Sequence, residues 1–168
     1  AYVELGMASC FSFLRGASDA VDLASEAWAL GYDCLAIADL NTLAGVVRIW
    51  AQARKAALRP LIGARIELIS GEVFLAYPRN RDAYGRLAAH SEGLILIVVP
   101  GPDVAAFGRG LGRLCRILPA LSYVAAAYLY RGDDTVRINQ LDSLAQAHRL
   151  RLLATNEVLY HAPDRRPL

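Results

Sequence analysis

Short apolar runs alternate with amphipathic segments along nearly the whole chain. The run at residues 94–99 is continuously apolar and lies between Gly93 and Pro100, which is typical of a strand covered on both faces. Segments with apolar residues at helical spacing separate most of these runs. The pattern predicts strands at residues 2–5, 34–38, 61–68, 72–77, 94–99, 123–130 and 151–155, and helices at residues 20–30, 42–57, 80–89, 104–114 and 135–150.

This order of elements predicts an α/β protein with a mostly parallel sheet, either open or closed into a barrel. One interruption is expected, because only the turn residues Ser70 and Gly71 separate the runs at 61–68 and 72–77, which favours a hairpin. Ser18 or Asp19 is expected to cap the first helix, and Gly31 to end it. A chain of 168 residues suggests one domain over residues 1–168.

Composition limits the class of protein. Hydrophobic residues make up 55% and charged residues 20%, as in a globular chain with a large core. The apolar runs are shorter than the roughly 18 residues of a membrane helix, and no secretory signal is evident, so we expect no membrane association. Cys10, Cys34 and Cys115 show no zinc-site spacing and fit a reducing, cytoplasmic setting. The net charge is only +2, and the strongest local group of basic residues, Arg149 with Arg151, is better interpreted as a solvated helix end than as a duplex-binding face.

Acidic residues stand at or near the ends of three predicted strands: Asp39, Glu67 and Glu157. Carboxylates that meet at one end of a parallel sheet or barrel form sites for hard cations or for acid–base chemistry. His161, just after the last strand, is the histidine best placed to join them. Each acid could instead be a structural group that caps a turn or helix. Leu40, directly after Asp39, brings neither a metal ligand nor a proton carrier.

Common phosphate and hydrolase motifs do not occur. The glycines at 108, 110 and 112 lack the preceding strand and the spacing of a phosphate-binding loop, and no G-x-S-x-G sequence is present. These observations argue against nucleotide-binding and α/β-hydrolase classes.

Several strings of the sequence together resemble one family. The chain is similar to the PHP (polymerase and histidinol phosphatase) domain at the N-terminus of bacterial C-family DNA polymerase III alpha subunits, and looks most like the error-prone, damage-inducible branch. The resemblance covers almost the whole chain in order and is carried by residues 2–5, 11–18, 38–47, 61–65, 77–79, 83–87, 92–96 and 154–161.

The resemblance implies a distorted seven-stranded (β/α) barrel with two or three metal ions at the strand ends, which hydrolyses phosphoesters or, in some members, acts as a 3′–5′ exonuclease. The family's His-x-His pair falls on Gly6 and Ala8, its Asp-His pair on Asp39 and Leu40, an acid on Glu67, and its final Asp-x-His on Glu157 and Leu159. Four imidazole positions therefore carry no imidazole, which weakens any metal cluster.

We therefore expect a degenerate, non-catalytic scaffold at the start of a longer DNA-directed DNA polymerase that acts in translesion synthesis and DNA repair. Its expected partners are the remaining domains of that polymerase, replication or mutagenesis accessory proteins, and DNA through the full-length protein. No obligatory cofactor is expected; a weakly bound Mg, Mn or Zn ion would use Asp39, Glu67, Glu157 and His161. The alternatives are a metal-dependent phosphoesterase or 3′–5′ exonuclease, and an interaction module with no polymerase attached.

The resemblance also implies a departure in length. The family has a long segment after the position of Leu87, whereas here residues 87–90 run almost directly into the strand at 94–99. Either this loop is shortened, or a stretch is missing from the sequence as given.

Overall fold

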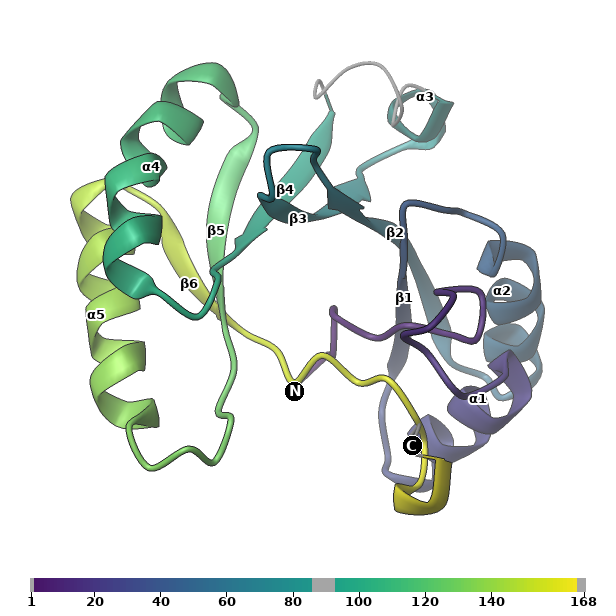
Figure 1. Ribbon diagram of the computed structural model, residues 1–168. Helices are drawn as coiled ribbons and strands as arrows, with labels where there is room; N and C mark the ends of the chain where they lie inside the picture. The colour runs from purple at the N-terminus through teal and green to yellow at the C-terminus, as the bar shows by residue number, and fades with distance from the viewer. Residues whose placement is uncertain (1, 86–92, 166–168) are drawn as a thin grey trace. The chain divides into compact units, whose positions relative to one another are not determined.

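The computed structural model describes residues 2–85 and 93–165 (Figure 1). The chain divides into two compact units, Ala1–Ile66 with Glu157–Leu168, and Glu67–Asn156. The elements of the first are α1 (Ala20–Ala29), β1 (Cys34–Leu40), α2 (Val46–Lys55), β2 (Arg59–Glu67) and a short 3₁₀ turn at Pro163–Arg165. Those of the second are β3 (Val73–Pro78), α3 (Arg81–Gly85), β4 (Leu94–Val99), α4 (Val104–Ile117), β5 (Leu121–Ala126), α5 (Asp134–Ala147) and β6 (Arg151–Ala154).

The first unit is built on a parallel pair of strands. β1 and β2 pair from Cys34 opposite Arg59 to Leu40 opposite Arg65. Helices α1 and α2 pack against each other and against β1, and bury Ile37, Ile49 and other apolar side chains between them. Asp19 is the N-cap of α1, as the sequence predicts, and its carboxylate accepts a hydrogen bond from the backbone N–H of Ala20.

Helix α2 begins four residues later than the sequence pattern predicts. The Thr42 hydroxyl accepts a hydrogen bond from the Ala44 N–H at 3.1 Å, and Asn41 adopts a left-handed φ of 51°. Both features favour a turn over a helix, because short polar side chains compete for the backbone donors that a helix would use. The chain therefore turns at residues 41–45 and enters α2 at Val46.

Residues 2–5 do not form the predicted strand. The Glu4 carboxylate accepts hydrogen bonds from the Tyr2 hydroxyl and the Gly6 N–H, so this segment is held by local side-chain contacts. The chain then runs beside β1, where the Ala38 N–H donates to the Met7 carbonyl at 2.8 Å.

The second unit mixes antiparallel and parallel pairing. β3 and β4 are antiparallel, from Val73 opposite Val99 to Pro78 opposite Leu94, whereas β4–β5 and β5–β6 are parallel. Helix α5 packs on β5 and β6 and also contacts α4. The turn expected at Ser70–Gly71 is present, with the Leu68 N–H donating to the Glu72 carbonyl at 2.9 Å.

Strand β5 is shorter than the predicted strand over residues 123–130. The buried Asp134 carboxylate accepts hydrogen bonds from the N–H groups of Leu129, at 2.6 Å, and Arg131, at 2.8 Å, and Tyr130 adopts a left-handed φ of 56°. These bonds gather residues 129–134 into a compact loop, so the extended backbone ends at Ala126.

The fold class is α/β, as predicted, with six strands in the part of the chain that the structure describes. The seventh predicted strand, over residues 2–5, is not among them. Residues 87–90, where a shortened loop is expected, lie outside the described residues, as does most of the second half of the helix expected at 80–89. Within residues 2–85 and 93–165, no helix has both the length and the apolar character needed to cross a bilayer.

Candidate functional site

Asp39 lies near the end of β1, and its side chain is almost completely buried, with 1% of the residue exposed. One carboxylate oxygen accepts hydrogen bonds from the Ser9 N–H at 2.7 Å and from the Ser12 hydroxyl at 2.7 Å. The Ser9 hydroxyl lies within 3.0 Å of both carboxylate oxygens. The protein itself therefore supplies hydrogen-bond donors to this buried acid, as burial of a charged group requires.

The loop over residues 9–16 closes tightly around this carboxylate. The Ser12 hydroxyl also accepts a hydrogen bond from the Leu40 N–H at 3.0 Å, which fixes the loop to the end of β1. A Cβ atom at Gly45 would lie 2.4 Å from an Asp39 oxygen and 2.9 Å from the Ser9 hydroxyl. Glycine is therefore the residue that lets α2 start this close to the acid.

Glu157 lies between two arginines. Its Oε1 atom is 2.9 Å from Arg65 Nη1, and its Oε2 atom is 3.3 Å from Arg15 Nη2. Arg65 has only 9% of its side chain exposed, whereas Arg15 and Glu157 have 28% and 29% exposed. Each oxygen of this predicted metal ligand therefore faces the guanidinium group of an arginine.

His161 has a different set of neighbours. Its Nδ1 atom lies 2.8 Å from the Ser18 hydroxyl and 3.9 Å from an Asp22 oxygen, and its backbone N–H donates to the same hydroxyl at 2.8 Å. Glu67 is exposed at the end of β2 and belongs to the second unit. Within residues 2–85 and 93–165, the structure contains no group of three or more His, Cys, Asp or Glu side chains that could together hold a metal ion.

The four positions that the resemblance assigns to imidazoles, Gly6, Ala8, Leu40 and Leu159, have backbone and packing roles here. The Gly6 N–H donates to Glu4, and the Ala8 N–H donates to the Val158 carbonyl at 2.9 Å. The Leu159 carbonyl accepts from the Ala17 N–H at 2.9 Å, and Leu40 is half-buried at the end of β1.

The chemistry of this donor set fits a structural network better than a metal cluster. Asp39 already accepts hydrogen bonds from the Ser9 N–H and from the hydroxyls of Ser9 and Ser12. The guanidinium groups of Arg15 and Arg65 would repel a cation brought to Glu157. The metal-binding role expected for Asp39, Glu67, Glu157 and His161 remains a prediction.

A thiol in the same loop is not activated. Desolvation, together with the negative charges of Asp19 and Asp39, raises the pKa of the Cys10 thiol above its usual value. The thiol is therefore protonated at neutral pH, which does not favour a nucleophilic role.

The sequence pattern predicts that Asp39 and Glu157 lie at or near strand ends. It does not predict the residues that contact these acids through hydrogen bonds or ion pairs, namely Ser9, Ser12, Arg15 and Arg65. One signal was available, because Arg65 interrupts an otherwise apolar stretch of β2 and is 7% exposed. A buried arginine needs an acidic partner. Its partner lies 92 positions away, which a local pattern does not reveal.

Comparison with known proteins gives the chain a family and a set of relatives. Residues 4–162 match the family model of the PHP domain. The error-prone DNA polymerases of Caulobacter vibrioides and Bradyrhizobium diazoefficiens are each 39% identical to this chain, and the alignments cover 99% and 100% of it. Error-prone DNA polymerase 3 of Agrobacterium fabrum is 35% identical over 99% of the chain.

The chain spans only 18% of the length of each of these relatives. The three alignments extend over 193, 204 and 190 residues, although this chain has 168, so the relatives carry residues that it lacks. This agrees with the expectation of a shortened or missing segment, although the alignment lengths do not say where it lies.

Solved structures share the fold at low sequence identity. One is an amidohydrolase from Chromobacterium violaceum with bound sulfate and no metal, which has a TM-score of 0.72 at 11% identity. The match covers 95% of this chain and 88% of that one. A candidate metal-dependent phosphoesterase from Bifidobacterium adolescentis has a TM-score of 0.66 at 14% identity, with 95% of this chain and 87% of that one covered. The match over residues 4–162 and the relatives along the whole chain together show that the chain belongs to the PHP domain family.

Proposed function

We propose that this chain is the N-terminal PHP domain of an error-prone DNA polymerase III alpha-type subunit, and that the domain itself is a non-catalytic scaffold. The full-length protein would be a cytoplasmic DNA-directed DNA polymerase that copies damaged templates and contributes to DNA repair. Support comes from the identity of up to 39% along the whole chain to curated error-prone polymerases that are more than five times longer.

The observation that carries the scaffold proposal is the position of Glu157 between Arg15 and Arg65. A PHP metal cluster would use this acid as a ligand for a divalent cation. Here two guanidinium groups already supply the positive charge, so an added cation would meet repulsion as well as competition. Asp39 is equally committed, because its oxygens accept hydrogen bonds from Ser9 and Ser12.

The same contacts give the scaffold a mechanical role. Arg65 comes from β2, Glu157 follows β6 in sequence, and Arg15 comes from the loop before α1. The ion pairs therefore tie together three segments of the first unit that are distant in the sequence. In this proposal, arginine side chains hold the ends of the strands where active PHP enzymes use metal ions.

The finer architecture belongs to the same proposal. We propose that the strands close into the distorted seven-stranded barrel of PHP domains, with residues 6–8 beside β1 at the remaining position. The hydrogen bond from the Ala38 N–H to the Met7 carbonyl supports this. The remaining polymerase domains and accessory proteins would dock on the outside, and DNA would be bound by the full-length protein.

Hydrolysis assays test this proposal against the alternative of a metal-dependent phosphoesterase or 3′–5′ exonuclease. The purified protein is incubated with Mg²⁺, Mn²⁺ or Zn²⁺ and either p-nitrophenyl phosphate or a 5′-labelled single-stranded oligonucleotide. We expect no turnover above that of the variants Asp39→Asn and Glu157→Gln. Metal-dependent turnover that both variants lose, and that the control Asp142→Asn on α5 retains, would refute the scaffold and establish the alternative.

A further inference from the structure

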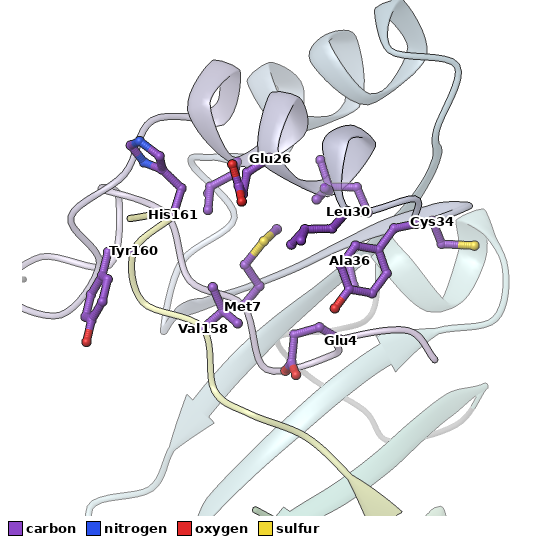
Figure 2. A pocket seen from close by; sticks show the side chains of 13 residues that line it. Glu4, Met7, Glu26, Leu30, Cys34, Ala36, Val158, Tyr160 and His161 are labelled. Carbon is purple, nitrogen blue, oxygen red and sulfur yellow. The ribbon is translucent and has the colours of Figure 1, made fainter. Parts of the chain in front are cut away.

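A cavity of about 200 Å³ lies in the first unit, away from the acids at the strand ends (Figure 2). It is bounded by α1, by Cys34–Ala36 in the first half of β1, and by residues 158–161. Its walls are mostly apolar and include Met7, Leu23, Ala27 and Val158. Asp39 lies three residues beyond Ala36 along β1 and does not line the cavity, so this is a separate feature of the domain.

The charged groups at this cavity are mainly acidic. Glu4 and Glu26 line it, no lysine or arginine does, and Figure 2 shows the Glu26 side chain extending from α1 toward Met7. Helix α1 contains no basic residue, and within the described residues no lysine or arginine forms an ion pair with Glu26. The cavity is therefore negative in a chain whose formal net charge is +2.

The place of Glu26 in α1 adds to this negative potential. Glu26 lies in the last turn of the helix, and its backbone carbonyl accepts the hydrogen bond of the Leu30 N–H. The C-terminal end of a helix carries a partial negative charge, so a carboxylate there is electrostatically unfavourable and makes the local potential more negative. Residues such as Glu26, whose charge is unfavourable where they stand in a helix, are often found at functional sites.

Two basic side chains near the cavity, Arg59 and His161, already have partners. The Arg59 guanidinium lies 3.1–3.2 Å from the sulfur of Cys34, which lines the cavity. His161 lines the cavity too, but its Nδ1 atom lies 2.8 Å from the Ser18 hydroxyl and 3.9 Å from an oxygen of Asp22, which is in the first turn of α1.

We propose that this cavity binds a small organic cation, an amidinium or ammonium group on an apolar body about as large as one aromatic ring. An apolar protein cavity of about 150 Å³ is large enough for benzene, so 200 Å³ leaves room for one ring and a small charged group. The apolar walls take the ring, and the carboxylate of Glu26 faces the cation. Neither the scaffold role nor its hydrolysis test depends on this site.

Binding of three matched probes tests the charge preference. The intact protein is titrated with benzamidine, benzamide and benzoate, and binding is followed by calorimetry and by NMR of the protein. We expect saturable binding of benzamidine at least about tenfold tighter than that of benzamide, which is about 1.4 kcal/mol, and no binding of benzoate. Equal affinities for the three probes, or no binding of benzamidine, would overturn the proposal.

Substitutions locate the site. Glu26→Gln, at an exposed position, is expected to weaken benzamidine binding by about three- to tenfold and to leave benzamide unchanged, since one charge-assisted contact is lost. Glu72→Gln, in the turn before β3, is the matched control and should bind like the unaltered protein. Ala27→Leu, which fills the cavity, should abolish binding of both. Unchanged benzamidine affinity in Glu26→Gln would overturn the proposal even if Ala27→Leu fails to fold.

Discussion

Arg65 and Glu157 form an ion pair at 2.9 Å although 92 positions separate them in the sequence. The arginine side chain is 9% exposed, so the pair is shielded from solvent on the β2 side. Glu157 adopts a left-handed φ of 51°, an uncommon conformation for a residue other than glycine. The ion pair therefore holds in place a segment whose backbone is not intrinsically favoured.

Loss of the buried arginine should cost more stability than loss of its exposed counterpart. We expect Arg65→Met to lower the free energy of unfolding by about 2–4 kcal/mol, because it removes the buried guanidinium group that pairs with Glu157. Arg15→Met should cost about 1 kcal/mol or less, since that contact is longer and more exposed. Urea denaturation of the two variants measures the difference. Equal losses would show that the Arg65–Glu157 pair has no special role.

The Ser12 hydroxyl joins two groups at the end of β1. It donates to Asp39 and accepts from the Leu40 N–H, so Ser12→Ala leaves a buried carboxylate and a backbone donor each short of a partner. We expect a loss of about 1–3 kcal/mol in the free energy of unfolding. Ser143→Ala on α5, whose exposed hydroxyl donates to the Asn139 carbonyl, is the control and should change stability by less than about 0.5 kcal/mol. A Ser12→Ala variant as stable as this control would contradict the network around Asp39.

Two glycine-to-alanine substitutions should have opposite signs. Gly45→Ala brings a Cβ atom against Asp39 and Ser9, and is expected to destabilise the protein by about 1–3 kcal/mol. Gly110→Ala on α4 meets nothing within 4 Å and should stabilise it by about 0.5–1 kcal/mol through the better helix propensity of alanine. Thermal unfolding of both variants, followed by circular dichroism, checks the contrast. A neutral Gly45→Ala would mean that α2 does not start as close to the acid as the structure has it.

Asp134 should make stability depend on pH in the acidic range. Burial opposes its ionisation, but the N–H groups of Leu129, Arg131 and Gly132 outweigh burial and hold the pKa of this carboxyl below its usual value of 3.8. Because the folded-state pKa is the lower one, the ionised form stabilises the fold above the unfolded-state pKa. That contribution is lost as the pH falls through the folded-state pKa.

Denaturation at a series of pH values tests this prediction. The free energy of unfolding should fall more steeply below about pH 4 in the unaltered protein than in Asp134→Asn, which has no carboxylate to protonate at this position. Parallel pH profiles for the two proteins would contradict the assignment.

The sequence predicts elements well where burial alone decides them. β4 is found with its predicted bounds because a strand covered on both faces is a continuous apolar run, and α1 is found because its cap and its buried face are local. The start of α2 and the end of β5 are missed, because side-chain bonds from Thr42 and Asp134 decide them. Such bonds override the hydrophobic pattern without altering it.

Of the candidate site, the acids could be predicted from the sequence, but the residues that contact them could not. Asp39 and Glu157 could be placed at strand ends from apolar runs and from the family resemblance. Their binding partners could not, because Arg15 and Arg65 meet Glu157 from 142 and 92 positions away. Only the fold brings these charges together, so the sequence did not reveal the arginines beside the predicted cation ligand Glu157.

We propose that protein cations and hydroxyls, rather than metal ions, hold the acids of this PHP domain. Thermal unfolding with and without chelator, Mn²⁺ and Zn²⁺ tests it most directly, because a metal at about 100 times its Kd stabilises the folded state by about 2.7 kcal/mol. We predict that chelator and millimolar metal leave the unfolding midpoint within about 1 °C, in the unaltered protein and in Glu157→Gln alike. A saturable rise of about 5 °C or more with metal, absent from Glu157→Gln, would contradict the account.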